Sequence, residues 1–243
     1  MKVVRTHVTE GSKKITPVAL LKFGELEHLS DLLKNGTVYL SSIEDLRKEE
    51  KGESQEKDMR NDAVEGAHKY RSGGPGTAAT TLPNGKPLSF SFIDIMYYEA
   101  PEVILGNICS FYGITTDSFS DNQLLPVDEK MTYFGSHFIF IKDFHEFINR
   151  VDKALEKLKI NWFYGYVEYF DEKQYDGEMH LFKKRSRFSF QNEFRIYLRT
   201  ENISSMKLDI GSIQDIAGIA PSNTISELKM TISTKSEDSS ELI

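Results

Sequence analysis

The segment FSFQNEFRIYLRT, residues 188–200, alternates between apolar and polar side chains. This period of two is typical of a β-strand that buries one face. Phe and aliphatic residues at positions 188, 190, 194, 196 and 198 form the apolar side. Gln191, Glu193 and Arg195 then follow one another on the polar side. We therefore expect a strand whose polar face either meets solvent or lines a site.

Other segments predict strands and helices that do not alternate regularly. Residues 25–36 predict a helix that stops at Asn35-Gly36, and an Asp143–Glu146 capping pair begins a helix that runs to about residue 159. Gly, Thr and Pro at 71–87 predict a loop. Expected strands are 17–24, 37–42, 88–100, 106–116, 136–143, 163–170 and part of 205–222.

This irregular order disfavours a doubly wound parallel sheet. It favours the α+β class, with largely antiparallel β-sheets and flanking helices. No linker divides the chain, so we expect a single domain over residues 1–232. The polar stretch 233–243 is expected to be a frayed tail.

Composition and net charge disfavour some functions. Hydrophobic residues make up 39% of the chain and charged residues 28%, as in ordinary globular proteins. The net charge of −7 disfavours a protein that binds nucleic acid over its whole surface. Six Lys and Arg residues nevertheless lie between positions 183 and 199. They predict either a solvated charged surface or a local patch that holds phosphates.

Several common sites and signals are missing from the sequence. Cys109 is the only cysteine, which excludes an internal disulfide and disfavours a Cys-based zinc site. Neither a phosphate-binding P-loop nor a dinucleotide fingerprint is present. A Ser-His-Asp triad stays open, because its members need not be close in sequence. No signal peptide and no apolar run of about 20 residues are found, so we expect a cytoplasmic protein without a membrane partner.

What remains is a distributed set of polar residues. Lys22 lies at the end of the first expected strand, and Tyr39 and Ser41 share the polar face of the second. Glu193 lies on a much later strand. Each also has an ordinary interpretation as a solvated or paired side chain.

The stretch ALLKFGELEHLSDLLKNGTVYLSS, followed much later by FSFQNEF, resembles the ADP-ribosyltransferase fold and in particular the DarT-type toxins that modify nucleic acids. This resemblance implies split β-sheets and NAD as substrate. It implies Glu193 as the catalytic residue and Gln191 as a residue that orients the acceptor. Lys22-Phe23 stands at the NAD-binding position where the family usually has His or Arg.

Longer stretches, among them YLSSIEDLRKEE, MRNDAVEG and FKKRSRFSFQNEFRI, resemble a bacterial family without an assigned activity that is met in prophage and phage-defence settings. This resemblance implies one polar cluster made of Arg47, Arg60, Asp62, Glu65, Gln191, Glu193 and Arg195.

Together the resemblances imply a division of roles. Tyr39 would stack on nicotinamide, Ser41 would hold the ribose, and Arg47 or Arg60 would neutralise the diphosphate. The remaining residues would contact the acceptor or support the site: Asp62, Glu65, Arg195, Lys184 and Arg187.

The expected function is therefore a toxin or phage-defence effector that transfers ADP-ribose from NAD to RNA or DNA, without a metal ion. Such an enzyme would need a neutralising antitoxin partner. Two alternatives stay open. One is a nuclease or other hydrolase that binds a divalent metal through Asp62, Glu65 and Glu193. The other is a non-catalytic recognition module.

Overall fold

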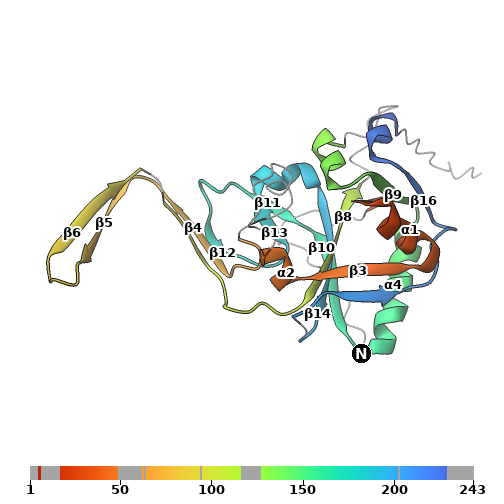
Figure 1. Ribbon diagram of the computed structural model, residues 1–243, viewed down its shortest axis with the longest axis horizontal. Helices are drawn as coiled ribbons and strands as arrows, with labels where there is room; N and C mark the ends of the chain where they lie inside the picture. The colour runs from red at the N-terminus through yellow and green to blue at the C-terminus, as the bar shows by residue number, and fades with distance from the viewer. Residues whose placement is uncertain are drawn as a thin grey trace, which may run out of the picture.

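The computed structural model describes residues 5–6, 17–48, 62, 64–93, 95–115, 127–201 and 203–228. Their arrangement is mixed α+β, with mostly antiparallel strands in several sheets and few helices, which confirms the expected class at this level (Figure 1). In the part of the chain that is described, no helix is long and apolar enough to cross a membrane. The predicted tail, 233–243, lies outside the described residues.

Nine strands of the described chain form the central sheet. Their order is β1-β10-β14-β8-β2-β9-β16, while β3 pairs with both β8 and β15. All these pairs are antiparallel except β1–β10. The strands are β1 (Arg5–Thr6), β2 (Ala19–Gly24), β3 (Thr37–Ser42), β8 (Asn107–Ile114), β9 (His137–Ile141), β10 (Asn161–Tyr166), β14 (Glu193–Arg199), β15 (Met206–Asp209) and β16 (Ala217–Pro221).

Both faces of the central sheet are buried. On one face, Leu20 of β2 packs in a cluster with α4 (Phe144–Leu158) and α1 (Leu26–Asn35). On the other face, the next residue, Leu21, packs with the 3-10 helices η2 (Glu129–Phe134) and η4 (Ser222–Glu227). The alternation of side chains along a strand explains why neighbours in sequence enter different clusters. The sheet is therefore the rigid centre from which polar side chains can be positioned.

The predicted helix signals are confirmed. The Asp143 side chain accepts a hydrogen bond from the backbone N–H of Glu146 at 2.9 Å, which caps α4. Gly36 ends α1 with φ at 74°, and its N–H donates to the carbonyl of Leu32. A side chain at Gly36 would collide with the backbone of Gly211, so this turn requires glycine on two grounds. It leads directly into β3.

The prediction of a loop at 71–87 is wrong. This region contains most of β4 (Lys69–Gly73), all of β5 (Gly76–Thr81) and the start of β6 (Pro87–Phe92). Figure 1 shows β5 and β6 as a two-stranded ribbon that projects far from the rest of the protein. We name residues 76–92 the arm. Small Thr, Ala and Gly side chains weaken the period-two signal of β5, which explains the wrong prediction.

The remaining elements change other predictions in detail. The expected strand 88–100 is divided into β6 and β7 (Ile95–Glu99), and 163–170 into part of β10 and β11 (Glu168–Phe170). The expected strand 188–200 begins only at Glu193, because residues 186–191 form the 3-10 helix η3 (Ser186–Gln191). Asn192 adopts a left-handed conformation between them. Also present are α2 (Ile43–Lys48), β12 (Asp176–Glu178) and β13 (Lys183–Arg185).

Candidate functional site

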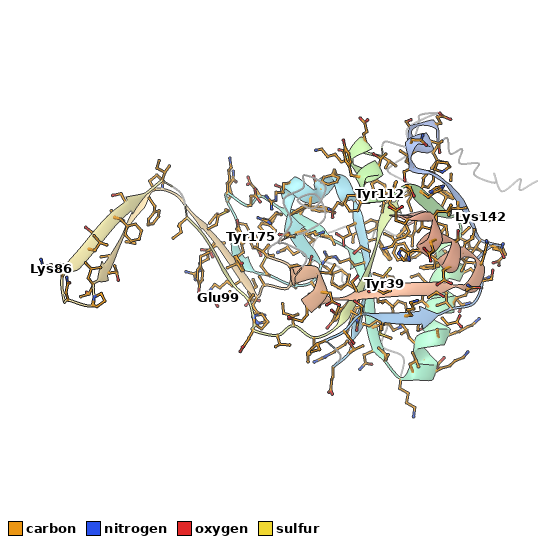
Figure 2. The ribbon with its side chains drawn as sticks, in the orientation of Figure 1. Tyr39, Lys86, Glu99, Tyr112, Lys142 and Tyr175 are labelled. Atoms are coloured by element: carbon orange, nitrogen blue, oxygen red, sulfur yellow. The ribbon has the colours of Figure 1, made fainter. Side chains whose placement is uncertain are left out.

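A cleft of about 720 Å³ opens over β2, β3, β8 and β14. Its size falls within the range of typical small-molecule sites, about 300–1,000 Å³. Apolar walls come from residues such as Phe111, Tyr112 and Phe134, and polar groups are concentrated where β14 meets β8. Figure 2 labels Tyr39 and Tyr112, which line the cleft from β3 and β8. The cleft therefore combines apolar walls with many polar and charged side chains.

Glu193 is the centre of the polar group. One carboxylate oxygen accepts hydrogen bonds from the Ser110 hydroxyl and from Arg195 Nε, the latter at 2.5 Å. The other oxygen accepts from Lys184 Nζ at 2.8 Å. Ser110 lies directly opposite Arg195 in the pairing of β8 with β14, so the sheet register brings the hydroxyl to the carboxylate. Glu193 is only 4% exposed.

Arg195 joins Glu193 to a distant segment. Its two terminal nitrogens donate to the two carboxylate oxygens of Glu65 at 2.6 and 2.7 Å, and one of them also donates to the carbonyl of Leu181. This bidentate geometry is the strong form of an Arg–carboxylate pair. Arg195 is 2% exposed. A buried guanidinium thus holds residue 65 against the central sheet.

A second buried ion pair holds the same segment. Arg185 of β13 donates from Nε to Asp62 Oδ1 at 2.8 Å. The same Asp62 oxygen accepts the backbone N–H of Val64, which shapes the turn that leads to Glu65. Asp62 and Glu65 therefore hold residues 62 and 64–66 in place. We call Asp62, Glu65, Lys184, Arg185, Glu193 and Arg195 the charged cluster.

The charged cluster is balanced, with three carboxylates and three cations in contact. Burial alone would raise the pKa of the Glu193 carboxyl, but Arg195 and Lys184 outweigh it and hold that pKa well below its usual range. Burial would likewise lower the pKa of Arg195, but Glu193 and Glu65 raise it. Glu193 is therefore ionised at neutral pH.

This lowered pKa predicts an acid-sensitive fold. As the pH falls through about 4.3, the ordinary Glu pKa, unfolded chains bind a proton at residue 193 that the folded protein does not bind. The stabilisation from Glu193 is thus complete above that pH and decreases below it, toward the lower folded pKa. Urea unfolding between pH 7 and pH 3 should show a shallower acid decline for Glu193→Gln than for the wild type. Equal slopes for the two proteins would contradict the assignment.

Lys22 approaches the cleft from the neighbouring strand β2. Its Nζ donates to the carbonyl of Ser110 at 2.7 Å and lies 5.4 Å from the centre of the Phe111 ring. It forms no ion pair within the described residues. Burial raises the pKa of the adjacent Cys109 thiol, while Lys22 opposes that shift. Cys109 is thus a buried, protonated side chain.

Most of the site residues predicted from sequence line the same cleft. These are Lys22, Phe23, Tyr39, Ser41, Asp62, Glu65, Lys184, Gln191, Glu193 and Arg195. Gln191 is held there by Lys184, whose Nζ donates to its side-chain oxygen at 2.8 Å. Of the implied polar cluster, Glu65, Gln191, Glu193 and Arg195 are linked through side-chain hydrogen bonds, and Asp62 lines the same cleft. The side chains of its other two members, Arg47 and Arg60, lie outside the described residues.

Three predicted residues are not placed in the cleft. Arg187 is exposed on η3, where its guanidinium lies 4.9 Å from the centre of the Phe188 ring. The side chain of Arg47, in α2, and the whole of Arg60 lie outside the described residues. The predicted basic patch at 183–199 is smaller on the surface than the sequence suggests. Lys184 and Arg185 are buried in ion pairs and do not face solvent.

Sequence reasoning missed Ser110 and Lys207. The sequence shows Ser110 as a polar residue within the largely apolar run NICSFYGI. This pattern does not predict that its hydroxyl contacts Glu193. Lys207 lies on β15 directly opposite Tyr39 of β3 and lines the cleft. Only the pairing of β15 with β3 brings this cation to the cleft.

Comparison with known proteins gives no relative from which a role could be transferred. No protein-family profile, no curated protein and no solved structure matches this chain.

Proposed function

We propose that this protein is an NAD-dependent ADP-ribosyltransferase with an ADP-ribosyltransferase-like arrangement of split sheets. One observation carries the proposal: Lys22, Tyr39 and Glu193, from three different strands, line one cleft of suitable size. The strand–helix–strand unit β2-α1-β3 supplies the first two residues, and β14 supplies the third. These three residues offer a cation, an aromatic ring and an ionised carboxylate around a cleft whose volume suits a dinucleotide.

Glu193 would act on the nicotinamide ribose. When the bond between ribose and nicotinamide breaks, the sugar acquires oxocarbenium character, which a nearby carboxylate stabilises. A ribose hydroxyl would replace the Ser110 hydroxyl at Glu193 Oε1, so one neutral donor is exchanged for another. Lys184 and Arg195 would remain in place and keep the carboxylate ionised and oriented.

The rest of NAD would contact the walls of the cleft. Tyr39 is 54% exposed, so its ring can stack on the nicotinamide without a rearrangement of the core. Ser41 would hold the ribose, and Phe23 would hold the base. Gln191 would hold the acceptor. Lys22 and Lys207 are cations of the described lining that can face the diphosphate.

We propose a nucleic acid, RNA or DNA, as the acceptor. After Lys184 and Arg185 are assigned to buried pairs, Arg187 and Arg199 are the exposed cations of the 183–199 region. Arg187, on η3 just before β14, can contact acceptor phosphates. An enzyme of this kind inside a cell requires control, so we also propose a neutralising antitoxin or a trigger such as phage infection.

Labelled NAD tests this function. The wild-type protein, incubated with RNA, DNA and cell lysate, should transfer label to nucleic acid. Tyr39→Ala should lower transfer at least about fivefold, because it removes one stacking contact of about 1–3 kcal/mol. Tyr97→Ala is the matched control, since Tyr97 is 53% exposed on β7 and does not line the cleft. It should transfer at the wild-type rate.

Other outcomes point elsewhere. Label on protein bands alone would overturn the nucleic-acid acceptor and leave the transferase class. Absence of transfer, together with absence of NAD binding by calorimetry, would overturn the proposal as a whole.

A non-catalytic recognition module is the second candidate. One observation favours it: Glu193 already accepts hydrogen bonds from three side chains, as a purely structural carboxylate would. In that case NAD or another ligand would bind without turnover. The metal-dependent hydrolase has less support, because the described residues contain no group of three His, Cys, Asp or Glu that could hold a metal. Asp62, Glu65 and Glu193 each pair with Lys or Arg instead.

A further inference from the structure

The arm has one apolar and one polar face. The pairs Gly76–Phe92, Ala78–Phe90 and Thr80–Leu88 point to the same side of the ribbon. The pairs on the other side consist of Thr, Ser, Ala and Pro residues. Leu88 and Phe90 are exposed, so no described residue covers them.

Such a surface is unusual for a ribbon that projects into water. A two-stranded hairpin alone is only marginally stable, and it usually needs a third strand or a layer packed on its apolar face. Figure 1 shows the arm extending away from the central sheet, and Figure 2 labels Lys86 at its far end. Lys86 is the only charged residue between positions 72 and 93. A layer that packs on the apolar face of the arm would therefore meet an uncharged surface and should itself be apolar and uncharged.

The apolar face is divided lengthwise into two rows. Strand β5 contributes the small side chains Gly76, Ala78 and Thr80, and β6 contributes the large ones, Leu88, Phe90 and Phe92. The Phe92 ring already lies over Gly76, where a Cβ would collide with it. Beyond this point, toward the tip, Phe90 is 54% exposed beside its small neighbour Ala78. A ridge and a furrow thus run side by side.

We propose that the arm is a dimerisation element that packs against the arm of a second copy of this chain. A two-fold axis that runs along the ribbons, between two facing arms, exchanges their rows. Phe90 of each copy then lies over Ala78 of the other, and Leu88 lies over Thr80. A two-fold interface must be complementary to itself, and from Ala78 to the tip this face satisfies that condition in shape and in charge.

Other occupants fit less well. A nucleic acid or an anionic lipid surface would need several cations, and the arm has one. A second arm supplies an uncharged apolar face of equal length without any further requirement.

Sedimentation equilibrium on the full chain tests the dimer. The wild type should be a dimer at micromolar concentration. Phe90→Asp should dissociate it, with at least about a hundredfold weaker Kd, since it places a charge in the buried centre. Ser89→Asp is the matched control. It also introduces an aspartate, one residue earlier and on the polar face, and should leave Kd unchanged. Far-UV circular dichroism should be the same for all three proteins.

A size swap tests the rows themselves. Phe90→Ala should leave a gap opposite Ala78, and Ala78→Phe should place two rings against each other, so each weakens the dimer about tenfold or more. The double variant Ala78→Phe, Phe90→Ala restores one large and one small residue at the same level, and its Kd should return close to the wild-type value.

Three results would overturn the proposal. A wild-type protein that is monomeric at its highest soluble concentration excludes a dimer. A dimer that withstands Phe90→Asp is held together elsewhere. A monomer that cosediments with phosphatidylcholine vesicles through Phe90 assigns the apolar face to lipid instead.

Discussion

Replacing Arg195 by leucine should lower the free energy of unfolding by about 3–5 kcal/mol, because it removes the cation from a buried ion pair. Glu65 would lose both hydrogen bonds that Arg195 donates to its carboxylate, and Glu193 would lose one of its cations. Two carboxylates would then be buried with too few donors. Urea unfolding at pH 7, followed by circular dichroism, measures the loss.

Arg150→Leu is the matched control for Arg195→Leu. Arg150 also binds two carboxylates, those of Glu146 and Asp215, but this pair lies at the surface of α4. Water and salt screen exposed pairs, so only a small loss is expected. If both variants lost the same stability, the burial of Arg195 would not explain the effect.

Phe147→Ala should also cost about 3–5 kcal/mol, as large-to-small replacements of buried aromatic residues do. Phe147 is fully buried between α4 and the sheet, and its ring meets the edge of Phe111 with centroids 5.4 Å apart. The vacated volume cannot close, because the sheet on one side and α4 on the other are fixed by other contacts. The same urea titration gives the value.

Leu158→Ala provides the comparison on the same helix. Leu158 follows Val151 and Leu155 at helical spacing in the sequence, but it is 54% exposed at the last position of α4. Its replacement should change the free energy of unfolding by no more than about 0.5 kcal/mol. A loss comparable with that of Phe147→Ala would mean that the helix end packs more tightly than its exposure indicates.

The local part of the fold is predictable from sequence because its signals are local. The Asp143 cap, the glycine at 36 and the alternation in β3 all act within a few residues of the element they define. Leu158 shows the limit of this reasoning. A helical period predicts which face is apolar, but the exposure of the last turn depends on where the sheet beneath it ends.

The candidate site is predictable only in part. Alternation correctly separates Glu193 and Arg195 from the apolar face of β14. It does not predict that both side chains are buried. The reason is Glu65, which lies 130 positions before Arg195 and covers it. Spacing along the chain contains no information about such a partner.

The arm was missed for a different reason. Gly, Thr and Pro favour loops in a compact protein, where strands are recognised by large alternating side chains. In β5 the small residues occupy the row beside Phe90 and Leu88, so their size follows from the neighbouring strand. A single-strand pattern cannot reveal a requirement that arises between two strands.

The order of strands in the central sheet has a consequence for biosynthesis. Strand β8 lies between β2 and β14, and the carboxylate of Glu193 reaches the cleft only when β14 joins β8. A ribosome that adds about 5–20 residues each second must therefore translate past residue 199 before the charged cluster can assemble. Until then the nascent chain exposes the unpaired edge of β8 and carries no complete site. Premature termination before β14 should therefore leave a fragment that lacks the charged cluster and exposes an unpaired strand edge, which favours aggregation.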